Sequence, residues 1–501
     1  MHPALETIRS CVVGTPFEGD LYLVGGAVRD SLLGLDGSDD LDLVSTQPAS
    51  ALVELLWNRG VCDFHPVVYE RFGTAMVSVG GQKVEVVQTR RESYSARSRK
   101  PSVQPGTLRE DAERRDFTIN SLMRSLNDWS LVDPLGCGVD DLQNGVLRTP
   151  LEPRKTFHDD PLRMLRAVRF RHRFGFSYFE GLAEAISISA PRLKIISTER
   201  IRDEVFKMLL HPSASAALDD LLSLGLLEQF LPEFLPLKGC EQGEWHYQDA
   251  WDHTRQVVDN LHNLSRRIGK IQVESVESGE DHDLEPVAHL TPQPPLPPGA
   301  EMGSPGIATL LAGLFHDVAK PQTRTEPVPG EVHFYGHDHE GAKVARRVLK
   351  RLKVPGDTID VVSILVENHM RLSSANEFGT PAIRRLIRDM GEQLDPLLDL
   401  CEADRLAHKN GAPLTDLRQR IDKVRKETPA ESLESPLSGE EIMELLSLPP
   451  GPEVGVWKKR LVEALIEGTI EDPDSARAWL LNGIAVGVTS TSSATDSPQQ
   501  S

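Results

Sequence analysis

The sequence has few cysteines, and they lie far apart. There are five, with no Cys-x-x-Cys pair among them: Cys11, Cys62, Cys137, Cys240 and Cys401. This odd, scattered set argues against a disulfide scaffold and against a cysteine zinc finger. It indicates free thiols in a reducing compartment.

Long hydrophobic runs are also absent. No apolar stretch approaches the roughly 20 residues that a membrane-spanning helix needs. The start of the chain, MHPALETIRSCVVGTPFEGD, lacks the basic residues followed by a long apolar stretch that mark a secretory signal. We therefore expect no membrane association and a cytoplasmic location.

Positive charge is scarce overall but locally concentrated. The net charge of -20 argues, taken alone, against a nucleic-acid partner. Residues 148–210 nevertheless hold thirteen Lys and Arg residues against eight Asp and Glu. Such a basic stretch on an acidic protein fits an RNA affinity that weakens with salt.

The length of 501 residues, with 39% hydrophobic and 26% charged residues, fits a globular chain of several domains. Residues 20 to about 150 alternate short apolar runs with turn signals, which predicts strands mixed with helices. From about residue 155 the apolar residues recur every three or four positions, which predicts helices. The expected fold class is α+β, a mixed-sheet head followed by an all-helical region.

A glycine turn opens the first chemically informative segment, LYLVGGAVRDSLLG. Gly25 and Gly26 end a predicted strand, and they let the backbone approach a ligand closely. The helix that follows presents free N–H groups to a phosphate, and Arg29 adds a charged donor one turn later.

Two aspartates follow the turn on the next predicted strand. Asp40 and Asp42 are two residues apart, so their carboxylates point to the same face. Oxygen ligands of this kind suit Mg²⁺, and Glu85 on a later strand is a candidate third ligand. A glycine pair is usually only a turn and a lone DxD only a solvated strand face, but their order and spacing together are far more specific.

These residues resemble the DNA polymerase β-like nucleotidyltransferase superfamily, and more narrowly the class II CCA-adding enzyme and bacterial poly(A) polymerase family. GGAVRDSLLG followed by DLD matches the first motif of that family, with one residue inserted that leaves Asp39 adjacent but out of register. The resemblance implies nucleotidyl transfer with two Mg²⁺ at Asp40 and Asp42. It implies CTP and ATP as substrates and tRNA as partner.

The next match is DAERRDFTINSL at residues 111–122. Adjacent arginines beside aspartates also describe an ordinary salt-bridged surface. In the resembling family this motif contacts the triphosphate and ribose, which assigns Arg115 and Asp116 to nucleotide binding. NSLM stands here where many relatives have NAMA.

A basic helix is predicted in HDDPLRMLRAVRFRHRFGF, residues 158–176. Asp160 suits the N-cap, Pro161 the first position and Gly175 the end. Three-residue spacing puts four side chains on one face: Asp160, Arg163, Arg166 and Arg169. The plain alternative is an N-cap followed by an exposed basic stripe.

Base chemistry favours a nucleotide-selecting role for this helix. Cytosine and adenine each present an amine beside a bare ring nitrogen, so a carboxylate and an arginine can bind both and reject guanine and uracil. The resembling family selects nucleotides through the Asp and Arg of an EDxxR motif, which match Asp160 and Arg163. Asp159 replaces the glutamate, and Arg166 and Arg169 match positions that face nucleotide or phosphate.

Histidines and aspartates in the second half match the HD-type metal phosphohydrolase pattern: His253, His316, Asp317, His337, His369 and Asp404. A single histidine is more often a core or surface residue than a ligand. Imidazole and carboxylate together suit a transition metal such as Mn²⁺, Ni²⁺ or Fe²⁺, which can activate water against a phosphoester. Whether such a site is active is left open by the motif alone.

We expect five parts along the chain. They are a nucleotidyltransferase head at 1–150, a helical neck with the nucleotide-selecting and RNA-binding region at 151–235, an HD domain at 236–410 with a disordered insertion at about 264–306, C-terminal helices at 411–484 and a disordered tail at 485–501. The segment 411–501 carries no motif that we can interpret.

Several functions remain open at this point. The segment 89–108 resembles a form found in relatives that divide CCA addition, so an A-adding or CC-adding specialist and a poly(A) polymerase are alternatives to full CCA addition. An HD phosphohydrolase with an inactive transferase head is another, and a non-catalytic RNA-binding protein a third. The intact carboxylates and arginines argue against the last two.

Overall fold

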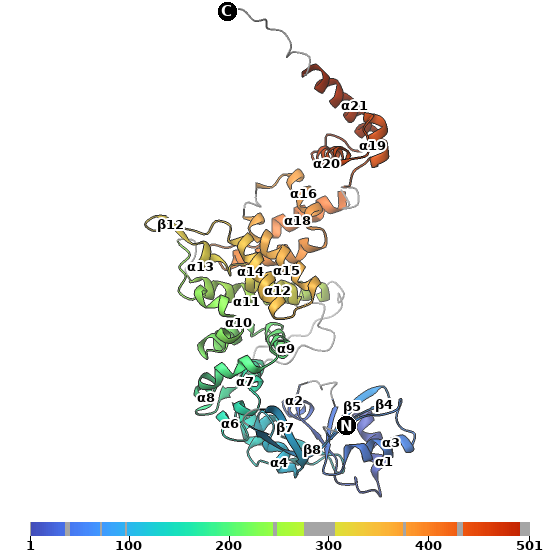
Figure 1. Ribbon diagram of the computed structural model, residues 1–501, viewed down its shortest axis with the longest axis vertical. Helices are drawn as coiled ribbons and strands as arrows, with labels where there is room; N and C mark the ends of the chain where they lie inside the picture. The colour runs from blue at the N-terminus through green and yellow to red at the C-terminus, as the bar shows by residue number, and fades with distance from the viewer. Residues whose placement is uncertain are drawn as a thin grey trace, which may run out of the picture.

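The chain extends along one long axis, with a mixed-sheet head at one end and the C-terminal helices at the other (Figure 1). This is a computed structural model that describes residues 2–35, 41–70, 73–95, 98–243, 248–274, 306–373, 377–427 and 434–490. No helix in these ranges is long and apolar enough to cross a membrane.

The head is built on a seven-stranded sheet in the order β3-β4-β5-β2-β1-β8-β9. β2 and β5 are parallel, and the other neighbours are antiparallel, which confirms the expected mixed sheet. The strands are β1 (Tyr22–Val24), β2 (Leu41–Ser45), β3 (Val67–Tyr69), β4 (Thr74–Val79), β5 (Gln82–Gln88), β8 (Met123–Ser125) and β9 (Leu131–Val132).

Helices cover this sheet because apolar residues alternate along its strands. On β4, Ala75, Val77 and Val79 are buried while the residues between them are not. The head helices are α1 (Pro3–Val12), α2 (Gly26–Leu32), α3 (Ala49–Asn58), α4 (Leu108–Glu113), η2 (Thr118–Asn120) and α5 (Gly138–Gln143). A separate hairpin, β6 (Arg90–Ser95) and β7 (Ser98–Pro105), precedes α4.

The neck is helical and begins against the head. Its central helix α7 (Leu162–Phe174) ends at Gly175, whose φ of 69° is the left-handed conformation that glycine adopts freely. Around it lie α6 (Pro153–Asp159), α8 (Leu182–Ser189), η3 (Ala190–Ile195), α9 (Thr198–Leu209), α10 (Ala214–Ser223), η4 (Leu227–Gln229) and η5 (Pro232–Leu237). The short strands β10 (Val146–Leu147) and β11 (Ser177–Tyr178) pair beside it.

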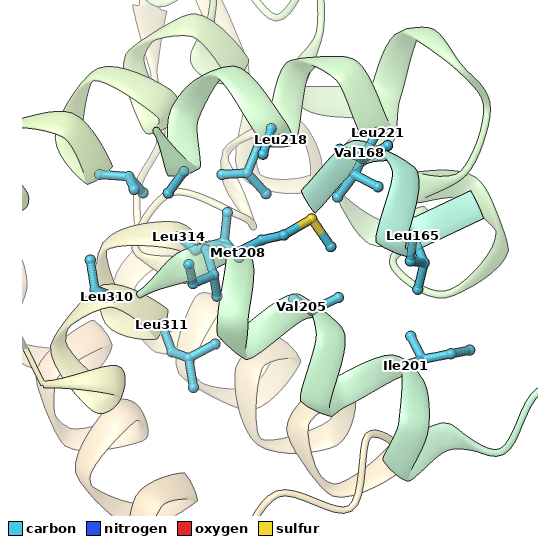
Figure 2. Packing of buried hydrophobic residues seen from close by; sticks show 14 of the residues in the cluster. Leu165, Val168, Ile201, Val205, Met208, Leu218, Leu221, Leu310, Leu311 and Leu314 are labelled. Atoms are coloured by element: carbon cyan, nitrogen blue, oxygen red, sulfur yellow. The ribbon is translucent and has the colours of Figure 1, made fainter. Parts of the chain in front are cut away.

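Helix α9 joins the neck to the helices that follow. Its apolar residues Ile201, Val205 and Met208 lie between α7 and α10 on one side and α12 on the other (Figure 2). One continuous buried cluster therefore runs from the head through the neck into the next domain.

In the described ranges, the third part contains eight helices and helical turns around a small hairpin, besides α16, which lies with the C-terminal helices. The helical elements are α11 (Ala250–Glu274), α12 (Ile307–Phe315), α13 (Lys320–Thr323), α14 (His337–Arg351), α15 (Gly356–Asn368), η7 (His369–Leu372), η9 (Gly391–Gln393) and α17 (Leu394–Leu406). The hairpin is β12 (Thr325–Val328) with β13 (Glu331–His333).

The remaining helices lie towards the far end. They are α16 (Thr380–Met390), α18 (Thr415–Glu427), α19 (Gly439–Leu446), α20 (Pro452–Ile466) and α21 (Pro473–Ser490). α19, α20 and α21 share a small apolar core of their own. Arg385 and Arg388 of α16 connect this unit to the rest through ion pairs with Glu463.

Two expected boundaries differ from the structure. α11 continues to Glu274, whereas an insertion was expected from about residue 264, because Leu264, Ile268 and Ile271 continue the helical spacing. α21 likewise continues to Ser490, beyond the expected start of the tail at 485. Residues 275–305 and 491–501 lie outside the described residues.

Candidate active site and metal centre

The glycine turn, a strand carboxylate and an arginine meet at one end of the head sheet. Val24, the last residue of β1, pairs with Asp42 on β2, so the turn that follows β1 lies beside that carboxylate. A Cβ built on Gly25 would lie 3.7 Å from Asp42 Oδ2 and 3.8 Å from Arg115 NH1. Gly25 has a φ of 78°, which a side chain would strain. The turn therefore keeps a narrow space open between a carboxylate and a guanidinium.

A second carboxylate stands beside Asp42. Strands β2 and β5 are parallel, and Asp42 is in register with Glu85. Register partners in a sheet project to the same face, so the two carboxylates are neighbours. This donor set of hard oxygens fits a divalent cation such as Mg²⁺. Asp40, the other expected ligand, lies outside the described residues.

Arg115 is held in place by a buried aspartate. Asp111 accepts from Nε and NH2 of Arg115 through Oδ2, and from Arg114 through Oδ1 at 2.6 Å. Burial opposes ionisation of Asp111, but the two guanidiniums hold its pKa below the usual value. The salt-bridged arrangement is therefore present, and it positions Arg115 beside the glycine turn.

Arg29 supports the turn from inside. It is buried, and its NH2 lies 3.5 Å from the position of a Cβ on Gly26. Its Nε donates to Asp30 and its NH1 to Asn120, while the guanidinium stacks over the rings of Phe170 and Phe174. These rings belong to α7, so a neck helix packs against the glycine-turn motif of the head.

Asp116 also links the head to the neck. Its Oδ1 accepts from Asn120 at 2.9 Å, and its Oδ2 accepts from Arg166 of α7 at 2.7 Å. Although burial acts in the opposite direction, Arg166 and the Asn120 hydrogen bond hold the pKa of Asp116 well below its ordinary value.

The four residues of the basic helix have different surroundings. Arg163 donates to the carbonyl of Arg114, next to Arg115, which brings the neck to the head site. The helix begins at Leu162 with Pro161 as its N-cap, one residue later than expected. Asp160 still accepts a hydrogen bond from the Leu162 backbone N–H at 3.1 Å, as a capping residue does.

Two residues of the next neck helix complete this group, and the sequence analysis did not single them out. Arg200 lies 2.8 Å from Asp160 Oδ2. Glu204 is buried and accepts from Arg169 at 2.6 Å, with Arg166 at 3.6 Å. Arg169 is therefore buried in an ion pair, whereas Asp160, Arg163 and Arg166 remain half-buried. The signal was the acid and base pattern of the segment 197–210, which only its placement beside α7 makes interpretable.

All six expected metal ligands of the helical domain come together. They form two trios whose ligand atoms lie within 4.8 Å of one another, His253 with His316 and Asp404, and Asp317 with His337 and His369. They are contributed by α11, the end of α12, α14, η7 and α17. Five of the six are nearly inaccessible to solvent, and Asp404 is the most exposed.

The imidazoles are oriented for metal binding. Nδ1 of His316, His337 and His369 lies within 2.8 Å of a backbone carbonyl three residues earlier. A carbonyl accepts only, so Nδ1 carries the proton and Nε2 faces inward, the arrangement that orients histidines at metal sites. Burial lowers the pKa of His369 to about 4, which keeps its ring neutral. The donor set of imidazoles and carboxylates fits a divalent transition metal.

The fold and the two sites define a nucleotidyltransferase head joined to an HD domain, and both sites offer ligands that suit divalent metal ions. Three protein-family models match successive segments of the chain and agree with this division. The poly(A) polymerase head domain matches residues 21–148, the probable RNA- and SrmB-binding site of polymerase A matches 175–237, and the HD domain matches 250–408.

Known proteins match over nearly the whole chain. The A-adding tRNA nucleotidyltransferase of Deinococcus radiodurans is 33% identical over 479 residues, which cover 93% of this chain and 96% of the relative. The CC-adding tRNA nucleotidyltransferase of Thermus thermophilus is 32% identical and covers 92% and 93%. The crystal structure of the Bacillus stearothermophilus CCA-adding enzyme with CTP superposes with a TM-score of 0.66 at 22% identity, covering 98% of this chain and 100% of that one. The chain belongs to the tRNA nucleotidyltransferase and bacterial poly(A) polymerase family.

Proposed function

We propose that this enzyme adds all or part of the CCA end to tRNA from CTP and ATP. The observation that carries the proposal is the meeting of Gly25, Asp42, Arg115 and the neck residue Arg163 at one end of the head sheet. A strand carboxylate, an open turn and an arginine there suit a triphosphate, and the neck stands where a base can be read.

The residue roles follow from this geometry. Asp42, with Asp40 and Glu85, would hold Mg²⁺, which lowers the pKa of an attacking hydroxyl and neutralises a leaving pyrophosphate when bound. Gly25 and Gly26 leave room for phosphate oxygens, and Arg115 supplies positive charge to them. Arg29 acts from behind the turn, and Asp116 holds the neck against the head.

Base selection is assigned to Asp160 and Arg163. A carboxylate that accepts from an exocyclic amine and a guanidinium that donates to a ring nitrogen match both cytosine and adenine. Arg166 and Arg169 set the position of α7 through Asp116 and Glu204.

The domain roles and the location are part of this proposal. Residues 1–150 would carry catalysis, 151–235 nucleotide selection and RNA contact, and 411–484 would support the tRNA. All five cysteines are free thiols, which favours a reducing compartment and hence the cytoplasm.

Three tRNA transcripts test the reaction. The purified chain is incubated with tRNAs that end before CCA, after C and after CC, with Mg²⁺ and with CTP and ATP singly or together. Extension of all three to CCA and no further supports complete addition. Growth of only the CC-ended tRNA by one A identifies an A-adding enzyme, and arrest after CC identifies a CC-adding enzyme. A long A tail identifies a poly(A) polymerase, and no extension contradicts the proposal.

A second activity is favoured by the histidine cluster. Six inward-facing ligands in a buried site fit hydrolysis of a phosphate ester with Mn²⁺, Ni²⁺ or Fe²⁺. Hydrolysis of a chromogenic phosphodiester by wild-type protein, and its loss in Asp317→Ala but not in Asp42→Asn, supports this activity. Loss only in Asp42→Asn contradicts it.

A further inference from the structure

The face of the head sheet that carries the catalytic carboxylates continues beyond Glu85 as an apolar surface. Glu85 on β5 is in register with Met76 on β4, and Met76 is in register with Val67 on the edge strand β3. Register partners project to the same face, so both apolar side chains lie on the face of Asp42 and Glu85. Tyr69 shares this face, because it stands two residues after Val67 on the same strand.

The three apolar side chains of this row are open to solvent. Met76 is 37% exposed, Tyr69 47% and Val67 49%, whereas the residues that alternate with Met76 on β4 are buried on the other face of the sheet. Lys83 is also exposed on the carboxylate face, two residues before Glu85 on β5, where it can contact a phosphate. Adjacent exposed apolar side chains with a nearby positive charge suit a ligand that has flat bases and phosphates.

The two sides of Asp42 differ in what they can bind. On the β1 side lie Gly25 and Arg115, to which the proposed function assigns the triphosphate. On the β5 side lie Glu85 and then the apolar row. The attacking and leaving oxygens of nucleotidyl transfer lie roughly in line, so the RNA hydroxyl approaches from the side opposite the pyrophosphate. The end of the RNA therefore lies over β5 and β4.

The spacing of the strands fits the end of an RNA chain. Neighbouring strands lie about 4.8 Å apart, so Met76 stands one strand from Glu85 and about 10 Å from Asp42 across the sheet. A 3′-hydroxyl at the carboxylates has its own base one ribose away, over Met76. The preceding base then lies over the edge strand, at Val67 and Tyr69.

We propose that Met76, Val67 and Tyr69 form the surface on which the last two bases of the RNA rest, the terminal base against Met76 and the preceding base against Tyr69. The inference rests on the proposed nucleotidyl transfer and specifies where the RNA end binds. Apolar and aromatic side chains stack on any base, which suits a reaction in which the 3′ end of the RNA changes with each nucleotide added.

Photo-crosslinking locates the RNA end without reference to turnover. The tRNA that the wild-type protein extends in the transcript assay is prepared with 4-thiouridine as its last nucleotide, bound to the full chain with Mg²⁺ and irradiated. Mass spectrometry is expected to find the cross-link on β3 or β4. A cross-link confined to the neck or the C-terminal helices overturns this site while leaving the transfer reaction intact. No extension of any tRNA by the wild-type protein overturns both.

Steady-state kinetics separates base stacking from a structural role. Tyr69→Ala is expected to raise the KM for tRNA by about 10-fold, the order of magnitude that stacking on an aromatic ring contributes for one base. The KM values for CTP and ATP should stay unchanged, because the nucleotide binds on the other side of Asp42. Tyr69→Phe keeps the ring and should retain the wild-type KM for tRNA.

Val67 and Val68 provide a matched pair of variants. They are adjacent on β3 and are 49% and 40% exposed, but they project to opposite faces of the sheet. Val67→Asp should raise the KM for tRNA, since it brings a negative charge to the RNA, whereas Val68→Asp should not. Equal KM values for tRNA in these two variants and in Tyr69→Ala, all folded by circular dichroism, overturn the proposal. A wild-type dimer that Val67→Asp dissociates without changing that KM assigns the edge strand to a second copy of the chain instead.

Discussion

Asp42 shows how a single position in the sheet acquires chemistry. It is a strand residue in register with the end of β1 on one side and with Glu85 on the other. Neither neighbour is close to it in sequence. The same carboxylate in an isolated DxD would be an ordinary solvated side chain.

Replacing Asp42 with Asn is expected to reduce nucleotide addition by at least about 100-fold, because a metal ligand contributes several kcal/mol to the transition state. The size and geometry of the side chain are kept and only its charge is lost. Single-turnover extension of labelled tRNA measures the effect, and circular dichroism checks the fold. A variant with wild-type rates would remove Asp42 from the catalytic centre.

Replacing Arg163 with Ala is expected to impair the use of both CTP and ATP, because its guanidinium stands beside the head motif. Arg171→Ala, a matched loss of charge on the same helix whose guanidinium pairs with Asp220, should leave nucleotide choice intact. Incorporation kinetics with each of the four nucleotides distinguish the two. Unchanged CTP and ATP incorporation in Arg163→Ala would rule out the assigned role.

Among the elements, α7 and α9 connect the head to the HD domain. α7 touches the head through Arg166 and the Phe170 and Phe174 rings, and α9 transmits the packing onward to α12 (Figure 2). One buried hydrophobic cluster therefore connects the part of the chain that holds the head site to the part that holds the HD site.

The contact between Asp116 and Arg166 should be visible in stability and its pH dependence. Asp116→Asn is expected to lower the free energy of unfolding by about 2 kcal/mol at neutral pH, since it removes the nearer of the two carboxylates that pair with the partly buried Arg166 guanidinium. Folding lowers the pKa of Asp116 from 3.8, so its contribution is fully present above about pH 4 and is lost as the pH falls further. Urea unfolding of both proteins should therefore show a difference that shrinks below pH 4. A difference that stays constant or grows there contradicts the ion pair.

The packing of α9 between the neck helices and α12 gives a prediction about stability. Met208 is buried between α10 and α12, so Met208→Ala should destabilise the protein by about 2–4 kcal/mol. Met208→Leu nearly keeps the volume and should cost less than about 1.5 kcal/mol. Thermal unfolding followed by circular dichroism measures both. Equal destabilisation by the two substitutions would show that the contact between α9 and its neighbours does not depend on the volume of the side chain at position 208.

At the scale of the whole molecule, charge is unevenly distributed. The chain carries -20 overall, yet thirteen basic residues lie between 148 and 210. The elongated shape separates this stretch from the C-terminal helices, whose segment 434–444 is acidic (Figure 1). We therefore expect the neck to contact the phosphate backbone of the RNA.

Salt dependence tests this surface. The logarithm of tRNA affinity should fall linearly with the logarithm of salt concentration, with a slope of about -0.7 to -0.9 for each phosphate contacted. Replacing the exposed Arg154 and Lys155 of α6 with Gln should reduce the slope by about 1 to 2. Lys343→Gln on α14, a charge removal outside the neck, should leave it unchanged. Equal slopes in all three proteins would exclude α6 from the RNA interface.

Much of this organisation was predictable because it is local. Short apolar runs between turn signals predicted the strands and helices of the head, and Gly175 marked the end of α7. The motif spacings selected Asp42, Arg115 and all six candidate ligands of the HD domain. The structure places Asp42 and Arg115 beside Gly25 and brings the six candidates together. Two boundaries were missed, because α11 continues to Glu274 and α21 continues to Ser490.

What the sequence by itself determined is therefore the type of chemistry, since residue types at fixed spacings on a strand or helix decide which groups can share a face. What only the tertiary structure decided is which partner each group has. Arg29 belongs to the glycine-turn motif and Arg169 to the basic helix, yet both are buried, Arg29 against Phe174 and Arg169 in an ion pair with Glu204. Asp317 has two oxygens that face two histidine pairs from four different elements. Such contacts join residues that are far apart in sequence, and their distances arise only when the helices pack.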